Sequence, residues 1–255
     1  MINKKPKVII LAAGEGKRLR PYTLDRPKCM VEINNISLID RQLKILRAEK
    51  LDQIVIIGGY KSEMLKRKNI KLKINPRYYE TNMAWTLFSA EEELDGDVII
   101  SYGDIVYSRE ILAKLLESNS DIAVTIDKDW KQYWSARNEN PLDDAETLKL
   151  REDGTIYEIG KKPNSFNEIE GQYMGLMKLS FKGVKQLKEM WQNNIKNRQL
   201  FSKPMENVYM TDVLQAMIDS KFLVNSVPIY GGWVEVDTVD DLKSSTTLER
   251  INLIS

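Results

Sequence analysis

The 255-residue sequence contains no histidine and only one cysteine, Cys29. Without histidine, the commonest general base, the commonest zinc ligand and the Ser-His and Cys-His catalytic pairs are excluded. A single cysteine excludes an internal disulfide framework and suits a reducing compartment, so we expect a cytoplasmic protein. An enzyme of this composition needs a reaction with little proton transfer. Transfer between phosphates is one, because Lys, Arg and Mg²⁺ catalyse it mainly by positioning and charge neutralisation.

The sequence also lacks an excess of one charge and a long apolar run. Lys and Arg total 38 against 37 acidic residues, so the overall charge favours neither a nucleic acid nor an anionic membrane surface. No run approaches the ~18 apolar residues of a membrane span, and the stretch Val8–Ala13 is too short for a secretory signal. The length and the 42% hydrophobic content suit a single domain over residues 1–255. The expected partners are small molecules.

Short runs rich in Val and Ile alternate with helical patterns along the first half of the chain. Ile39, Leu43 and Leu46 recur at helical spacing and predict a helix that covers one face of a sheet. Such alternation is typical of an α/β fold with a mostly parallel sheet. The turn Asp153-Gly154 lies between two strand-like runs and predicts an antiparallel addition to that sheet. The expected strands are 7–13, 53–58, 71–75, 98–102, 122–126, 147–150, 155–159, 172–180 and 233–236, and the expected helices are 38–51, 60–68, 83–94, 110–117, 184–193, 211–220 and 240–251.

Residues 127–146 do not show this periodicity. Trp130, Tyr133 and Trp134 lie in a polar stretch that Pro141 interrupts, which predicts an inserted functional loop. Aromatic residues of this kind either bind a ligand or pack the loop, onto its own domain or onto a second copy in a homodimer. Both interpretations remain open at this point.

A glycine-rich, basic loop follows the first expected strand. It reads Ala12-Ala-Gly-Glu-Gly-Lys-Arg-Leu-Arg-Pro21, and Pro27-Lys28 comes shortly after. Small residues let the backbone approach a triphosphate, their N–H groups can form an anion-binding nest, and Arg18 and Lys28 add full charges. A Walker A loop is excluded because Arg18 stands where Ser or Thr should follow the Gly-Lys pair, and a dinucleotide fingerprint would need its third glycine at Leu19.

The stretch from Leu11 to Pro21, together with Pro27-Lys28, resembles the signature of the sugar-nucleotide and phosphocholine-type nucleotidyltransferases. Further landmarks of that superfamily follow in its order, namely Gly58-Gly59-Tyr60, Asn82, Gly103-Asp104 and Glu235-Val-Asp237. The resemblance covers essentially the whole chain. It implies a three-layer α/β/α fold of the Rossmann-like, glycosyltransferase-A kind, a bound Mg²⁺ ion, and attack on the α-phosphorus of an NTP with release of pyrophosphate.

The resemblance also implies a role for each matching residue. Lys28 would neutralise the transition state and Arg18 would hold the β- and γ-phosphates. Asp104 and Asp237 would bind the metal, since two carboxylates and substrate phosphate oxygens make a typical Mg²⁺ shell. The sequence itself places Asp104 at the carboxyl end of a strand, where open α/β sheets bind ligands. The nucleotide-binding residues would be Leu11, Ala12, Ala13, Gly14, Glu15, Gly16, Gly59, Tyr60, Asn82 and Gly103.

Each of these assignments has a plainer alternative. Arg18 and Lys28 can be solvated surface charges, and Asp104 can be a turn residue. Asp237 can support the capping box that begins at Thr238. The glycines can serve only a tight turn between a strand and a helix.

The length of the chain and the residues of the 127–146 stretch suggest which kind of acceptor the enzyme uses. The compact chain looks closer to small CTP-dependent cytidylyltransferases, which act on phosphocholine, aminoethylphosphonate or phosphoglutamine, than to hexose-1-phosphate enzymes, which remain the alternative. Aromatic rings can bind an ammonium group by cation–π contact, whereas an arginine suits a carboxylate. The predicted acceptor-binding residues are Trp130, Tyr133, Trp134, Arg137, Lys161, Glu170 and Gln172. A non-catalytic nucleotide-sensing module is the alternative of another class, and the presence of both Lys28 and Asp104 favours catalysis over it.

Overall fold

The computed structural model describes residues 5–254. Its strands are β1 Lys7–Ala12, β2 Glu32–Ile33, β3 Ile36–Ser37, β4 Ile54–Gly58, β5 Lys71–Ile74, β6 Val98–Tyr102, β7 Ile105–Tyr107, β8 Ile122–Asp127, β9 Leu148–Leu150, β10 Thr155–Ile159, β11 Gln172–Leu179, β12 Gln199–Leu200, β13 Lys203–Pro204, β14 Val224–Ile229 and β15 Trp233–Glu235. Its α-helices are α1 Leu38–Ala48, α2 Met83–Phe88, α3 Arg109–Glu117, α4 Trp130–Arg137, α5 Phe181–Ile195, α6 Met210–Asp219, α7 Val239–Lys243 and α8 Ser245–Ile254.

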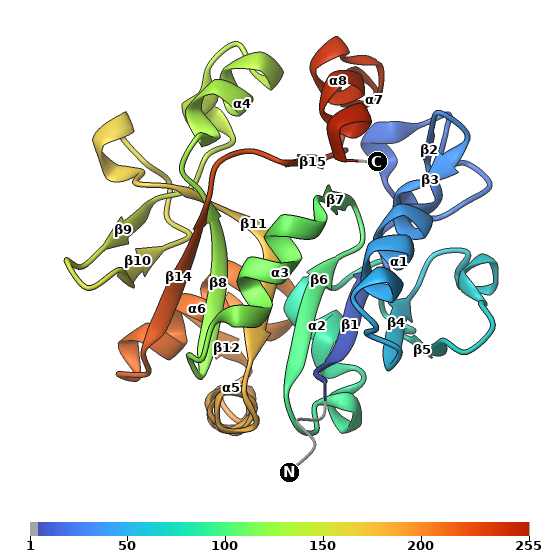
Figure 1. The fold of residues 1–255 in the computed structure, drawn as a ribbon. Coiled ribbons are helices and arrows are strands. Elements are labelled where there is room, and N and C mark those ends of the chain that lie inside the picture. The colour runs from blue at the N-terminus through green and yellow to red at the C-terminus, as the bar shows by residue number, and fades with distance from the viewer. Residues whose placement is uncertain (1–4, 255) are drawn as a thin grey trace.

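Within the described residues, nine strands form one central sheet in the order β5-β4-β1-β6-β11-β8-β14-β10-β9 (Figure 1). Strands β10 and β11 are antiparallel to both of their neighbours, and the other strands share one direction. The expected mostly parallel sheet with antiparallel additions is confirmed. Because β4, β1 and β6 are parallel neighbours, their carboxyl ends meet at one edge of the sheet. The glycine loop, the Gly58-Gly59 turn and Asp104 all follow strands at this edge.

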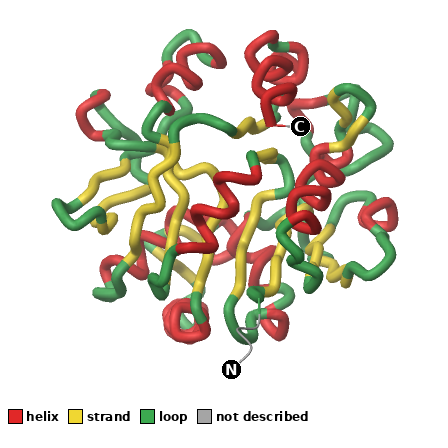
Figure 2. The backbone as a smooth tube through the Cα atoms, viewed as in Figure 1, coloured by secondary structure: helices red, strands yellow, loops and turns green. Residues whose placement is uncertain are grey.

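Helices cover both faces of the sheet, which gives the three expected layers (Figures 1 and 2). Successive side chains of a strand point to opposite faces. On β1, Ile9 and Leu11 belong to the core cluster that contains residues of α2, α5 and α6, whereas Val8 and Ile10 belong to the cluster that contains residues of α1 and α3. The α/β/α fold is therefore confirmed.

The segment that contains β15 and α7 runs across the edge of the sheet where β4, β1 and β6 end. After β14, strand β15 leaves the central sheet and pairs antiparallel with β7, so that Glu235 lies opposite Ile105. The N–H of Val236 donates to the carbonyl of Asp104 at 3.2 Å. Helix α7 then begins at Thr238 with a capping box in which Asp241 takes part, as the sequence predicts. The segment places Asp237 beside Asp104 although the two are far apart in sequence.

Four local expectations differ from the structure. The expected single helix over 240–251 is divided into α7 and α8, because Ser244 adopts an extended conformation. The expected helix over 60–68 is only a 3₁₀ turn at Ser62–Leu65, because Lys61 adopts a left-handed conformation with φ of 48°. The expected helix over 83–94 ends as α-helix at Phe88. The stretch 127–146, expected as a loop, contains α4. Within residues 5–254, no helix combines the length and apolar composition that crossing a membrane requires.

Candidate active site

Glycines allow the backbone of the candidate site to pack closely. The N–H of Gly103 donates to the carbonyl of Leu11 at 2.9 Å, and a side-chain carbon at Gly103 would lie 2.8 Å from that same oxygen. Gly16 has φ of 65°, and its carbonyl accepts a hydrogen bond from the Thr23 hydroxyl at 2.7 Å. Position 103 therefore needs a residue without a side chain, because β1 and the start of the Gly103-Asp104 turn are in contact.

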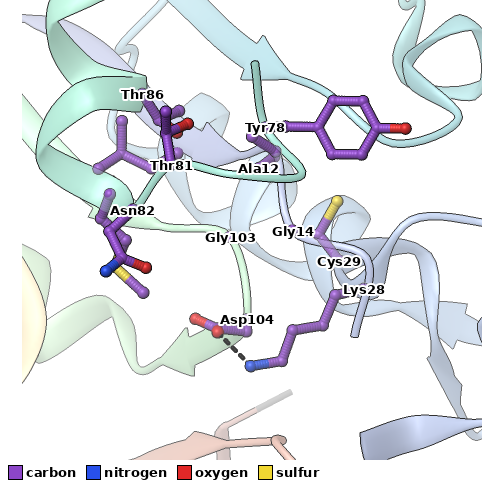
Figure 3. A pocket seen from close by; sticks show the side chains of 13 residues that line it. Ala12, Gly14, Lys28, Cys29, Tyr78, Thr81, Asn82, Thr86, Gly103 and Asp104 are labelled. Carbon is purple, nitrogen blue, oxygen red and sulfur yellow. Dashed lines mark hydrogen bonds and ion pairs between the residues drawn. The ribbon is translucent and has the colours of Figure 1, made fainter. Parts of the chain in front are cut away.

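A hollow of about 190 Å³ lies at the ends of β1 and β6, next to the start of α2 (Figure 3). Six of the predicted nucleotide-binding residues line it, and several further residues join them. The lining consists of Leu11, Ala12, Ala13, Gly14, Lys28, Cys29, Tyr78, Thr81, Asn82, Met83, Thr86, Gly103 and Asp104. Cys29 is 2% exposed, and burial raises the pKa of its thiol to about 12. The predominantly apolar walls suit a flat, weakly polar group such as a nucleobase.

A second, charged hollow adjoins the first and shares Lys28, Tyr78, Thr81 and Asn82 with it. The predicted phosphate-contacting residues lie here. Its remaining lining residues are Glu15, Gly16, Lys17, Arg18, Tyr79 and Asp237. The two hollows together offer an apolar end and a charged end, which is the arrangement that a nucleoside triphosphate requires.

Two predicted nucleotide-binding residues lie behind this lining. A side-chain carbon at Gly59 would be 2.5 Å from the Cβ of Tyr78, so Gly59 lets Tyr78 reach the wall of the hollow. Tyr60 donates its N–H to the carbonyl of Ala13 at 3.2 Å and its hydroxyl to the carbonyl of Leu24 at 2.7 Å. Both residues thus support the glycine loop from the adjacent β4 turn.

Three carboxylates meet where the charged hollow reaches the ends of β6 and β15. Asp104, Glu235 and Asp237 each offer an oxygen, and these oxygens all lie within 4.8 Å of one another. The ammonium of Lys28 pairs with Asp104 at 2.5 Å and also with Asp237. Among the described residues, no donor reaches Oδ1 of Asp104, which is buried. A group of carboxylate oxygens with one unpaired member is a donor set that suits a hard divalent cation.

The charges of the cluster depend on one another. Burial lowers the pKa of Lys28, but Asp104 and Asp237 outweigh that effect and hold this pKa above its usual value. Burial opposes ionisation of Asp237, but Lys28 outweighs it and lowers the pKa of Asp237. Burial, and next the charge of Asp237, raise the pKa of Glu235 to about 8. The cluster is therefore a strongly coupled set of charges, which is typical of functional sites.

Arg18 lies at the rim of this cluster. Its guanidinium is 3.4 Å from Asp237, and its side chain is largely exposed in the charged hollow. The structure thus brings the predicted basic pair, Arg18 and Lys28, and the predicted acidic pair, Asp104 and Asp237, to one place. Sequence reasoning did not assign Glu235 to the cluster, although the Glu-x-Asp pattern at the end of a strand was a usable signal.

The predicted aromatic acceptor residues are buried in α4. Trp130, Tyr133 and Trp134 belong to the core cluster on the α1 and α3 side of the sheet, and Tyr133 and Trp134 both contact Trp233 of β15. The rings pack α4 onto the domain, which is one of the alternatives that the sequence left open. A contact between these rings and an acceptor stays a prediction.

The remaining predicted acceptor residues lie at different places. Arg137 contacts carboxylates at the acidic cluster, with its Nη1 3.0 Å from Glu235. Lys161 is exposed and pairs with Glu158 at 2.7 Å. Glu170 accepts a hydrogen bond from the N–H of Leu150 at 2.5 Å.

Gln172, by contrast, is buried and binds the backbone of Glu146. Its side-chain oxygen accepts from the N–H of Glu146 at 3.1 Å, and its side-chain nitrogen donates to the Glu146 carbonyl. The predicted acceptor set is therefore not assembled around one cavity in this arrangement.

Residues 8–164 match the family model of the MobA-like NTP transferase domain. The chain belongs to this family. It is 41% identical to the CTP:phosphoglutamine cytidylyltransferase of Campylobacter jejuni over 92% of this chain and 97% of that protein. It is also 37% identical to the choline-phosphate cytidylyltransferase of Streptococcus pneumoniae over 40% of this chain and 46% of that protein. The predicted family is confirmed, and this MobA-like protein is a nucleotidyltransferase.

Solved structures share the fold of this nucleotidyltransferase. The inositol-1-phosphate CTP transferase from T. maritima aligns with a TM-score of 0.75 and 21% identity, over 97% of this chain and 95% of that one. The CTP:phosphocholine cytidylyltransferase from Streptococcus pneumoniae aligns with a TM-score of 0.70 and 21% identity, over 98% of this chain and 100% of that one. At these identities the likeness establishes the fold.

Proposed function

We propose that this protein is a Mg²⁺-dependent cytidylyltransferase that transfers CMP from CTP to a small, amine-bearing phosphorylated acceptor of the phosphoglutamine kind and releases pyrophosphate. The observation that carries this proposal is the 41% identity to a CTP:phosphoglutamine cytidylyltransferase along nearly the whole of both chains. The choline-phosphate relative supports CTP as the donor and an amine-bearing acceptor. The apolar and charged hollows supply room for a base and for a triphosphate, respectively.

The chain's own residues suit this reaction. Lys28 and Arg18 place two positive charges at the charged hollow, where charge builds up on the transferred phosphoryl group and the leaving pyrophosphate. Asp104, Asp237 and Glu235 have the ligand chemistry to hold the Mg²⁺ ion, which when bound would neutralise further phosphate charge. The acceptor phosphate is already ionised near neutral pH, so the reaction needs no general base, in agreement with a chain that has no histidine.

The acceptor approaches from the side of the cluster opposite the charged hollow, which would hold the leaving pyrophosphate, because attacking and leaving oxygens lie roughly in line. On that side, β11 and β8 follow β6 in the sheet. The ring of Tyr102, at the end of β6, lies edge-on to that of Tyr173 on β11, with the centroids 5.6 Å apart. Burial, and after it nearby charges that include Glu146, raise the pKa values of Tyr102 and Tyr173, so Glu146 lies near both rings. We assign the ammonium group of the acceptor to this carboxylate and these rings.

Glu146→Gln tests this assignment. Burial raises the pKa of Glu146. Its carboxylate accepts a single hydrogen bond, from the Thr211 hydroxyl at 3.3 Å. An ammonium group would therefore supply a charge partner that stabilises the ionised carboxylate. We expect the KM for an amine-bearing acceptor to rise by about 10-fold or more, while the KM for CTP stays within about twofold. Asp144→Asn, on the exposed surface two residues earlier, is the control. An unchanged acceptor KM in Glu146→Gln would contradict the assignment.

A substrate panel tests the proposed function itself. Pyrophosphate release is measured for each NTP with phosphoglutamine, phosphocholine, phosphoethanolamine, aminoethylphosphonate and glucose-1-phosphate as acceptors. We expect CTP to give the highest kcat/KM among the nucleotides, and amine-bearing acceptors to exceed glucose-1-phosphate by at least about 10²-fold, because a site built for a charged group rejects a ligand that leaves it unpaired. A higher kcat/KM for glucose-1-phosphate would establish the hexose-1-phosphate alternative.

A further inference from the structure

Arg137, the last residue of α4, reaches the acidic cluster from a buried position. Its side chain is 5% exposed. The guanidinium bonds to Glu235 at 3.0 Å through Nη1, and to both oxygens of Asp241 at 2.8 and 3.2 Å through Nε and Nη2. It also lies 3.9 Å from Asp237. One planar cation thus contacts two carboxylates of the cluster and the capping residue of α7.

Asp241 extends the reach of Arg137 to the backbone of the cluster. The oxygen of Asp241 that faces Nη2 of Arg137 also accepts from the N–H groups of Asp237 and Thr238, at 3.0 and 2.9 Å. Arg137 therefore holds the side chain of Glu235 directly, and the backbone of Asp237 through one intermediate carboxylate. Both contacts fix groups whose oxygens lie within 4.8 Å of Asp104.

Helix α4 in turn fixes Arg137. The guanidinium carbon lies 5.1 Å from the centroid of the Tyr133 ring and 5.6 Å from that of the Trp134 ring. The Tyr133 hydroxyl accepts from the N–H of Glu235 at 2.9 Å and donates to its carbonyl at 3.2 Å. Helix α4 thus contacts the side chain of Glu235 through Arg137 and the backbone of Glu235 through Tyr133. A buried guanidinium needs such a complete set of partners, because a buried ion left unpaired is strongly destabilising.

We propose that Arg137 is a positioning residue that sets the geometry of Glu235 and Asp237 for a divalent cation, with the aromatic side chains of α4 as its support. The inference rests on the metal site of the proposed function, and it is independent of which nucleotide or acceptor is used. A planar guanidinium can bond two carboxylates at once, whereas an ammonium group acts as a point charge. Outer partners of metal ligands commonly change metal affinity by about 10–100-fold.

Direct binding of Mn²⁺ to the free protein tests the proposal, with electron paramagnetic resonance reporting the unbound ion. We expect Arg137→Met to weaken Mn²⁺ binding by about 10–100-fold, and Arg137→Lys to lie between that variant and the wild type. The matched control is Arg250→Met. Arg250 packs on the same Tyr133 ring at 4.1 Å and donates to the Trp233 carbonyl at 3.2 Å, so its loss disturbs the aromatic support without removing a contact to the acidic cluster.

The outcomes separate the possible roles. Wild-type Mn²⁺ affinity in both Arg137 variants overturns the proposal, and a raised acceptor KM in those variants would then assign Arg137 to the acceptor carboxylate. Equal weakening in Arg250→Met also overturns it, since support of α4 alone would then explain the effect. If Arg137→Met does not fold, as judged by circular dichroism, Arg137→Lys carries the test. Failure of the protein to use CTP would contradict the proposed function and leave the Mn²⁺ measurement valid.

Discussion

Replacing Lys28 with alanine is expected to lower kcat by about 10³–10⁵-fold, the range for a cation that stabilises the transition state of phosphoryl transfer. The ammonium lies between the two hollows and bonds to Asp104 and Asp237, so its charge is held where the proposed function places the α-phosphorus. Steady-state turnover with saturating CTP and Mg²⁺ measures the effect. The KM for CTP should change far less, because the charge acts chiefly in the transition state.

Lys17→Ala is the matched control for this change. Lys17 belongs to the glycine loop and also lines the charged hollow, but its side chain is 68% exposed and its ion pair with Glu15 spans 3.6 Å. The Lys28 side chain is only 15% exposed and pairs with both Asp104 and Asp237. Its loss removes a buried positive charge from two carboxylates, so circular dichroism must verify the fold at the assay temperature. Near-wild-type kcat in a folded Lys28→Ala protein would remove Lys28 from the mechanism.

Loss of either proposed metal ligand, Asp104 or Asp237, is expected to have an effect of similar size. Asp104→Asn and Asp237→Asn should each lower kcat/KM by at least about 10³-fold at a fixed Mg²⁺ concentration and raise the Mg²⁺ concentration for half-maximal rate, since one hard oxygen ligand is replaced by a neutral amide. EDTA should abolish wild-type turnover, and added Mg²⁺ should restore it. Asp240→Asn, an exposed residue of α7, controls for a general loss of negative charge. Full activity in EDTA would exclude a metal-dependent reaction.

The sequence predicted the glycine loop and its charges because the reasons for those residues are local. Gly16 needs a positive φ, which is a requirement of its own backbone. Residues that depend on where distant segments meet were not found in this way. Tyr78, for instance, reaches both hollows only because Gly59 leaves room for its ring.

The expectation of a loop over all of 127–146 was wrong, because α4 has helical spacing without an obvious apolar stripe. Trp130, Tyr133 and Trp134 have the i, i+3, i+4 spacing of a helix face, and Arg137 continues it at i+7. The helix has only eight residues, and its inner face mixes rings with a buried cation, so it does not show the usual apolar stripe. This face packs against Trp233 and Glu235, which are distant in sequence, so its role depends on the tertiary structure.

Strand β14 is a second element that the sequence pattern alone did not predict. It lies between β8 and β10, yet it contains Asn225, Ser226 and Pro228, which weaken any strand pattern. The parallel pairing of β14 with β8 determines its conformation, and a single sequence does not reveal that pairing. Local propensity was overridden by tertiary contacts in both α4 and β14.

The buried position of Cys29 gives this protein a clean chemical background for labelling. Maleimides react with thiolates, and a thiol with a pKa of about 12 at 2% exposure offers almost none near neutral pH. A cysteine introduced at Tyr79, which is 64% exposed on the rim of the charged hollow, would therefore accept a fluorophore without prior removal of the native thiol. Binding and release of ligands at the charged hollow then become observable in real time, in a chain that keeps its own cysteine among the lining residues of the apolar hollow.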